Sequence, residues 1–366
     1  MTPEEAELLN ELTIIIPTYN RPLELERAIE YWRDTPVNVH ILDGSERPWF
    51  PLGPIESIPT VNYHHIPAKK DLSRMENYYQ RIFYGSKLPV TKFSAFGSDD
   101  DFYTISGLIS SIKVLKSQKN IDAVAGRILT YEQEKKLLWH HKYVPRTGRT
   151  DLETESIEEK LNTRSTWFLW AICKTDPWKA YLVTCFEETG FSKVMCYAHE
   201  WLSVWLSKAM FRTRYIDVIQ LVRRDNIAGW NQGPETPWEH FVCDSQNAEV
   251  IEEIARQFAK GFNAVTPLSE HPKNLELARE QMRLERIRAS KSGTALQESK
   301  TPKSVLGNIL FFFLPGLDIF WDRPRRLKYV WRNPKFQYSA KEQQEVEEIE
   351  KLLLMPREEL RLRANI

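Results

Sequence analysis

Residues 12–18 read LTIIIPT, a continuous apolar run of the kind found in a strand that is buried on both faces of a sheet. The next segment, 22–32, repeats apolar side chains at helical spacing and places Pro22 where a helix can begin. Strand-like and helix-like patterns then alternate along the chain, at 37–42, 61–66, 71–83, 90–96, 105–115 and 121–126. This alternation predicts an α/β fold with a doubly wound, mostly parallel central sheet.

Composition narrows the choice of partners and compartment. The 366 residues carry 50 basic and 50 acidic side chains, so no global field favours nucleic acid, and we expect no nucleic-acid partner. The N-terminal stretch MTPEEAELLNEL lacks the basic and apolar regions of a secretory signal. The four cysteines show no metal-ligand spacing and are expected to be reduced. A cytoplasmic protein is the resulting expectation.

Polar side chains gather where the predicted strands end. TYNR at 18–21 follows the first strand, Asp43 follows the second, and the acidic run 99–101 follows the strand at 90–96. Doubly wound sheets bind ligands beyond the carboxyl ends of their strands. The sequence therefore predicts a binding site at that edge.

Three consecutive aspartates, Asp99, Asp100 and Asp101, are the most unusual feature of this edge. Mg²⁺ and Mn²⁺ take oxygen ligands, commonly one or two carboxylates together with substrate phosphates. Such a metal would neutralise a nucleoside diphosphate and stabilise it as a leaving group. The alternative is that the acids cap the helix predicted at 105–115.

These motifs resemble the inverting family 2 glycosyltransferases, which have the GT-A fold. The resemblance lies in IIIPTYNRP at 14–22, ILDGS at 41–45 and FSAFGSDDDF at 93–102, and it covers roughly residues 12–235. Members typically follow the first strand with Pro-Thr-Tyr/Phe-Asn-Arg, place an aspartate after the second, and carry Asp-x-Asp after the fourth. The resemblance implies a GT-A fold, here with a helical C-terminal appendage.

By this resemblance, the nucleotide pocket is lined by Thr18, Tyr19, Arg21 and Asp43, with Asp43 hydrogen-bonded to the base. Each has a plainer reading. Tyr19 would only pack, Arg21 would pair with Glu24 or Glu26, and Asp43 would only begin a turn.

The same resemblance assigns the acids. Asp99 would lie near the ribose and the metal, Asp100 would contact the nucleotide, and Asp101 would be the main ligand of Mn²⁺ or Mg²⁺. Phosphate-binding charge would come from the segment 68–79, AKKDLSRMENYY, which departs from the Gly-x-x-x-Ala-Arg-Asn of many relatives. Arg74 is our choice there, and a solvated helix face is the alternative.

The acceptor side is predicted at 165–206, where the family carries an acidic pair at the start of a helix. Here the pair is His199-Glu200. Glu200 would take the proton from the acceptor hydroxyl as general base. His199 is the rival base or an acceptor-side neighbour, and Trp170 would stack on an acceptor sugar.

The chain divides into four expected parts. A catalytic domain covers 1–240, with a donor part at 12–130 and an acceptor part at 131–240. A helical extension, a Ser/Lys/Gly-rich linker and a C-terminal appendage follow at 241–290, 291–304 and 305–366. The apolar and basic stretch 305–335 would touch the inner face of a membrane peripherally or dock on the catalytic domain. A final helix at 340–363 would dock or support a homo-oligomer.

The sequence thus predicts a metal-dependent enzyme that transfers a sugar from a nucleotide-sugar donor to a glycan or lipid-linked acceptor. The resemblance implies that the donor is UDP-linked. A nucleotidyltransferase is disfavoured, because that class has a Gly-rich loop after its first strand and PTYNRP contains no glycine. The alternative from another class is a non-catalytic carbohydrate-binding or scaffold protein on a degenerate GT-A fold.

Overall fold

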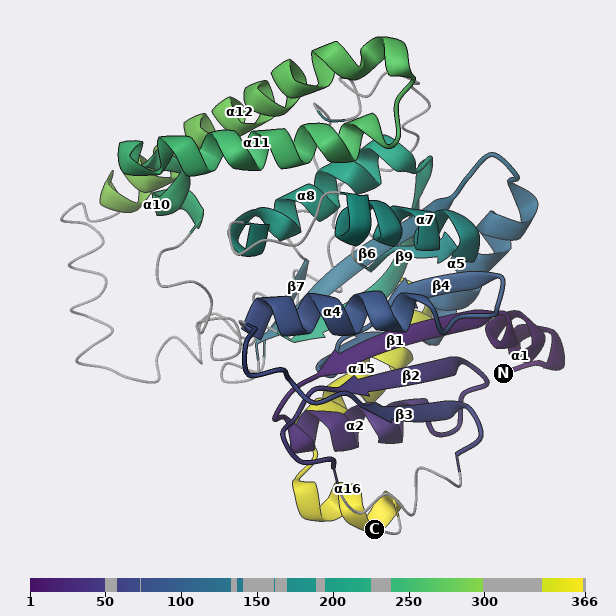
Figure 1. Cartoon of the computed structure of the whole chain (residues 1–366). Coiled ribbons are helices and arrows are strands. Elements are labelled where there is room, and N and C mark those ends of the chain that lie inside the picture. The colour runs from purple at the N-terminus through teal and green to yellow at the C-terminus, as the bar shows by residue number, and fades with distance from the viewer. Residues whose placement is uncertain are drawn as a thin grey trace.

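The protein is built on one mixed sheet covered by helices on both faces (Figure 1). The computed structural model describes residues 1–49, 58–72, 74–132, 137–140, 161, 170–188, 195–224, 238–298 and 338–364. Within these ranges the sheet has nine strands in the order β3-β2-β1-β4-β8-β6-β9-β5, with β7 paired to β6. The strands are β1 (Leu12–Thr18), β2 (Asn38–Asp43), β3 (Val61–His65), β4 (Phe93–Phe96), β5 (Asp101–Tyr103), β6 (Ala123–Glu132), β7 (Leu137–His140), β8 (Ile172–Lys174) and β9 (Thr213–Arg224).

Most of the sheet runs in one direction. Strands β3, β2, β1 and β4 pair in parallel, and β6 pairs in parallel with β9. Strand β8 is antiparallel to both β4 and β6, so these two groups point the same way. This arrangement confirms the predicted α/β fold with a mostly parallel sheet of the GT-A type.

The two faces of the sheet are separated by the alternation of strand side chains. Ile14 and Ile16 pack with α2 and α5 on one face, while Ile15 packs with α4, α7, α8 and α11 on the other. All three isoleucines are fully buried, as the apolar run predicted. The helices are α1 (Pro3–Asn10), α2 (Pro22–Trp32), α4 (Arg74–Ser86), α5 (Ile105–Ser117), α7 (Thr175–Val183), α8 (Met195–Met210), α10 (Trp238–Cys243), α11 (Ala248–Asn263), α12 (His271–Glu298), α15 (Ala340–Leu354) and α16 (Arg357–Ala364).

The C-terminal helices belong to the core of the sheet domain. Helix α15, drawn in yellow in Figure 1, lies against β5, β6 and β9. Its apolar residues Val346, Ile349 and Leu353 are at most 1% exposed. The face that we considered for oligomerisation is therefore used inside the chain. The single helix predicted at 340–363 is two helices, because Pro356 cannot continue α15 and Met355 is extended.

The described residues cover only part of the other predictions about chain organisation. Helix α12 continues to Glu298, into the segment 291–304 that we expected to be a linker. The apolar and basic stretch 305–335 lies outside the described residues. In the described part of the chain, no helix is long and apolar enough to cross a membrane.

Candidate active site at the carboxyl ends of β1, β2 and β4

The predicted strand ends meet at one edge of the sheet. Thr18 at the end of β1 lies in register with Asp43 at the end of β2, and Asp43 lies in register with His65 at the end of β3. On the other side of β1, strand β4 ends and the chain turns into the acidic run. Parallel pairing thus brings together three segments that are far apart in the sequence.

The turn after β1 aims Arg21 at the acids. Asn20 has a positive φ of 54°, and it is the one non-glycine residue of the described chain with such a value. Asparagine tolerates this left-handed conformation better than most residues. The amide N–H of Asn20 also donates to Ser45 Oγ at 2.9 Å, which ties the turn to the loop after β2.

Two of the aspartates are held by groups from the first strand and its turn. Arg21 Nη1 donates to Asp99 Oδ1 at 2.6 Å, and Arg21 Nη2 donates to Asp100 Oδ2 at 2.5 Å. Thr18 Oγ1 donates to Asp99 Oδ2 at 2.6 Å, and Ser98 Oγ donates to Asp100 Oδ1 at 2.5 Å. Every oxygen of these two carboxylates therefore accepts a hydrogen bond from the chain itself.

Arg21 does not pair with Glu24 or Glu26, which was the alternative role considered for it. In the described residues, Glu24 pairs with Arg27 and Arg224, and Glu26 pairs with Arg357 and Arg361. Arg21 makes its two ion pairs with the acidic run instead. Its side chain remains 27% exposed, so the guanidinium lies at the rim of the site, where a ligand can reach it.

The third aspartate begins a strand, which the sequence did not predict. Asp101 is the first residue of β5 and pairs across the sheet with Arg223 of β9. Its Oδ1 accepts a hydrogen bond from the backbone N–H of Arg224 at 3.1 Å. The cap of α5 is Thr104, whose hydroxyl accepts from Gly107 N. The alternative that the acids cap this helix is therefore wrong.

Asp43 sits in a compact network at the end of β2. Its Oδ1 accepts from the backbone N and the hydroxyl of Ser45, and its Oδ2 accepts from the hydroxyl of Tyr63 at 2.5 Å. The carboxylate thus holds the turn, as the plainer reading expected. A carboxylate offers about four acceptor positions, so these three bonds leave capacity for one more donor.

Sequence reasoning missed Arg81 of α4. Its guanidinium lies over the ring of Tyr19, 5.8 Å from the centroid, and a Cβ added at Gly44 would lie 2.2 Å from its Nη1. Gly44 is therefore required for the arginine to approach the turn. Arg81 follows Arg74 by seven residues, so it shares a helix face with our predicted phosphate-binding residue. The spacing of seven residues between the two arginines is the sequence feature that could have indicated Arg81.

The acidic run is buried, and its neighbouring carboxyl groups repel one another when ionised. Asp99, Asp100 and Asp101 are 2%, 8% and 6% exposed. Burial, together with repulsion from Asp100, raises the pKa of Asp99, although Arg21 and Thr18 oppose this shift. Burial and Asp100 also raise the pKa of Asp101 well above its ordinary value. The opposing charges of Arg21 at Asp99 and of Arg223 at Asp101 do not offset burial and the repulsion between neighbouring acids.

These raised pKa values bear on whether a divalent cation fits, because a nearby cation favours the ionised form of a carboxyl group. Among the described residues, no group of three or more His, Cys, Asp or Glu side chains forms a ready-made metal cage. Magnesium sites that also bind phosphates need only one or two protein carboxylates. The oxygen donors, their burial and their mutual repulsion fit a hard divalent cation that arrives with a diphosphate.

The predicted acceptor side is placed only in part. Trp170 is 8% exposed, and the Arg223 guanidinium lies 5.4 Å from its ring centroid. Since Arg223 is the cross-strand partner of Asp101, Trp170 lies beside the acidic run. His199 and Glu200 lie in α8, but this helix begins at Met195, so the pair falls in its second turn rather than at its start. Arg74 is the first residue of α4, and the placement of all three side chains is outside what the structure describes.

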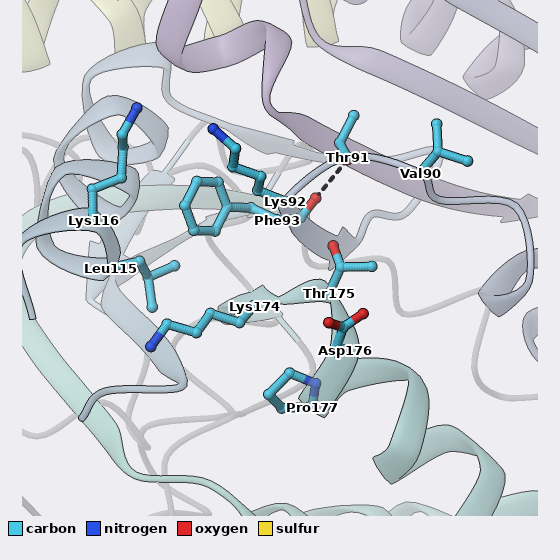
Figure 2. A pocket seen from close by; sticks show the side chains of 10 residues that line it. All are labelled: Val90, Thr91, Lys92, Phe93, Leu115, Lys116, Lys174, Thr175, Asp176 and Pro177. Atoms are coloured by element: carbon cyan, nitrogen blue, oxygen red, sulfur yellow. Dashed lines mark hydrogen bonds between the residues drawn. The ribbon is translucent and has the colours of Figure 1, made fainter. Parts of the chain in front are cut away.

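A separate pocket opens at the opposite, amino end of β4 (Figure 2). Its three lysines already have partners within the chain. Lys92 and Lys116 pair with Glu11, and Lys174 donates to the carbonyl of Lys119 at 2.7 Å. The pocket is lined by Val90, Thr91, Lys92, Phe93, Leu115, Lys116, Lys174, Thr175, Asp176 and Pro177. It is distinct from the site at the strand carboxyl ends.

The comparison with known proteins finds matches among solved structures. No protein-family model and no curated protein matches the sequence. The chain aligns with the crystal structure of S. aureus TarS 1–349 at 13% identity and a TM-score of 0.43, over 78% of this chain and 91% of that one. The complex of TarS 1–349 with UDP-GlcNAc aligns at 13% identity and a TM-score of 0.42 over the same shares. Its complex with UDP aligns at 12% identity and a TM-score of 0.43, again over 78% and 91%.

Fold and site together define an α/β protein of the GT-A type with an acidic site at its strand ends. The sheet order is that of a mostly parallel α/β fold, as predicted.

Proposed function

We propose that this protein is an inverting glycosyltransferase. It moves a sugar from a nucleoside diphosphate sugar, UDP-linked, to a hydroxyl of a glycan or a lipid-linked acceptor. The observation that carries the proposal is the convergence of Thr18, Asp43 and the buried run 99–101 at one edge of a doubly wound sheet. Ligands bind sheets of this kind at that edge.

The donor would be held by residues of the first two strands and their loops. Asp43 has capacity for one more hydrogen-bond donor, which suits an N–H of the nucleotide base. Tyr19, Arg81 and Arg74 would face the nucleotide and its phosphates. Asp99 and Asp101 would hold Mn²⁺ or Mg²⁺, and the metal would supply neutralisation of the departing diphosphate.

The transfer itself would be a direct displacement. The acceptor oxygen forms a bond to the anomeric carbon while the bond from that carbon to the diphosphate oxygen breaks, and the diphosphate leaves with the electron pair. Glu200 takes the proton of the acceptor hydroxyl. Trp170 and His199 would orient the acceptor. We propose a cytoplasmic enzyme that meets membrane-linked acceptors peripherally.

Substitution of Glu200 by Gln tests the transferase proposal. We expect Glu200→Gln to lower the release of UDP from UDP-sugars by about 100-fold or more, because a general base typically contributes this much. Binding of UDP should be unchanged, since the glutamate acts on the acceptor. A panel of UDP-sugars with Mn²⁺ present, followed by detection of released UDP, measures both the wild type and the variant.

Glu280→Gln on the outer helix α12 is the matched control, because Glu280 pairs with Arg283 far along the chain from the site. Full turnover by Glu200→Gln would contradict the assignment of the base. If the wild type released UDP from no donor while still binding carbohydrate, the carbohydrate-binding alternative would replace the enzyme.

A further inference from the structure

Asp99 and Asp100 are already paired with a cationic side chain of the protein, Arg21. The Arg21 guanidinium bridges Asp99 and Asp100 through two different nitrogens, at 2.6 and 2.5 Å. Charge-assisted hydrogen bonds of this kind are the strong ones in proteins. Any metal ligated by these carboxylates must therefore compete with the guanidinium.

We propose that Arg21 is a resident counter-ion that blocks the acidic run until a metal and a diphosphate arrive together. This inference rests on the proposed function and specifies how its site is loaded. A divalent cation held by Asp99 and Asp101 has to displace Arg21 from Asp99, which costs the guanidinium one of its two ion pairs. A nucleoside diphosphate offers Arg21 new anionic oxygens, so the metal and the nucleotide bind with positive coupling.

Two features of the structure suit such an exchange. Arg21 lies in the turn between β1 and α2, where its side chain is 27% exposed, whereas the Asp99 side chain is 2% exposed. The exposed partner can thus move while the buried one stays. Thr18, by contrast, holds Asp99 Oδ2 from the rigid end of β1 and keeps that carboxylate in place.

Reciprocity makes the coupling measurable from either side. If the nucleotide raises the affinity for the metal by a given factor, the metal must raise the affinity for the nucleotide by the same factor. Removing the competing guanidinium should strengthen metal binding when the nucleotide is absent and weaken this coupling. A residue that only stabilised the fold would produce neither effect.

The test compares Mn²⁺ binding by wild type, Arg21→Gln and Arg21→Lys, without nucleotide, by calorimetry and electron paramagnetic resonance. We expect Arg21→Gln to bind Mn²⁺ alone about tenfold or more tightly than the wild type, within the usual range of coupling between sites. Arg21→Lys should fall between them, because an ammonium is a point charge that lacks the planar fork. Addition of UDP should raise Mn²⁺ affinity more in the wild type than in Arg21→Gln.

Arg33→Gln is the matched control, since Arg33 follows the other end of α2 and pairs with Glu30. It should bind Mn²⁺ as the wild type does. If Arg21→Gln proves too unstable without metal, the melting temperature of Arg21→Lys supplies the readout, and Mn²⁺ alone should raise it more than it raises that of the wild type.

Equal Mn²⁺ affinities of wild type, Arg21→Gln and Arg21→Lys would overturn this inference and leave the proposed function standing. Failure of the wild type to bind UDP at any Mn²⁺ concentration would instead overturn the proposed function.

Discussion

At the scale of single residues, the strand-end site shows how polar side chains are oriented by the backbone around them. The positive φ of Asn20 turns the chain after β1, and Arg21 then reaches across to β4. Gly44 leaves the space that Arg81 fills. The residue types in the motif were readable from the sequence, whereas the partner of each side chain was not, because it comes from another strand.

His40 and His64 illustrate a titratable pair away from the acidic run. They lie on the neighbouring strands β2 and β3, with His40 Nδ1 and His64 Nε2 2.9 Å apart and their rings stacked. Burial, and then the positive charge that His64 can carry, lower the pKa of His40 to about 4. The folded protein therefore binds a proton at His40 less readily than the unfolded chain.

This shift predicts a loss of stability in mild acid. Well above pH 6.5 His40 is neutral in both states, so the shift has no effect there. As the pH falls from 6.5 towards 4, the unfolded chain takes up a proton that the folded protein does not, and the free energy of unfolding decreases. For this partly exposed residue we expect about 1 kcal/mol at pH 5.

Urea unfolding of wild type and His40→Phe at pH 7.5 and pH 5 measures this effect. The wild type should lose about 1 kcal/mol more than the variant between the two conditions. Equal losses would show that His40 is not the group responsible, since the carboxylates that also titrate there are common to both proteins.

At the scale of elements, α15 and α16 form part of the domain that carries the site. Phe102, which follows Asp101 in β5, packs in the same cluster as Val346 and Ile349 of α15. Glu345 of α15 also accepts hydrogen bonds from the backbone N and the hydroxyl of Ser106 at the start of α5. The C-terminal helices thus support the strand on which the third aspartate lies.

The buried Glu26 of α2 fixes the second of these helices. Its carboxylate, 2% exposed, accepts hydrogen bonds from Arg357 and Arg361 of α16. Arg27 of the same helix donates to the carbonyl of Met355, between α15 and α16. A contact between residues so distant in the sequence has no local signal, so the amphipathic pattern predicted a helix without indicating what it covers.

Truncation of Ile349 tests the structural role of α15. Ile349 is 1% exposed, so Ile349→Ala should lower the free energy of unfolding by about 2–5 kcal/mol through lost burial and a residual cavity. Denaturant unfolding gives the value. Glu347→Ala, at an exposed position on the same helix, should change it by less than about 0.5 kcal/mol. Similar small effects for both variants would mean that α15 does not pack on the sheet in solution.

At the scale of the whole molecule, the sequence predicted the part of the fold that is built from regular βα units. The bounds of strand β1 and helix α2 agree closely with the predicted ones. The bounds of β2, β3 and β4 differ from the predicted ones by a few residues at most. Strand β1 has a continuous apolar run and is buried along its whole length, which is why it was readable. The parallel pairing of β1 with β2 and β4 then brings the predicted site residues to one edge of the sheet.

The rest of the fold depends on contacts that local pattern does not specify. Strand β5 is three residues long and begins with an aspartate, so the sequence around it looked like the start of a helix. Strand β9 was not predicted, although its segment 213–224, TRYIDVIQLVRR, is rich in β-branched residues and buries Ile219, Leu221 and Val222. Its pairing with β6 and β5 joins residues far apart in the sequence, which no local pattern indicates. Arg223 and Arg224, which neighbour Asp101, were missed for the same reason.

The central claim is that the strand-end acids form a metal-dependent nucleotide site. Its most direct test is calorimetry of UDP binding with and without Mn²⁺, on wild type and Asp101→Ala. Asp176→Asn is the matched control, because Asp176 is an exposed aspartate at the opposite end of β4. We predict UDP binding that requires Mn²⁺ in the wild type and the control and that is lost in Asp101→Ala. UDP binding that is indifferent to both the metal and the substitution would contradict the account.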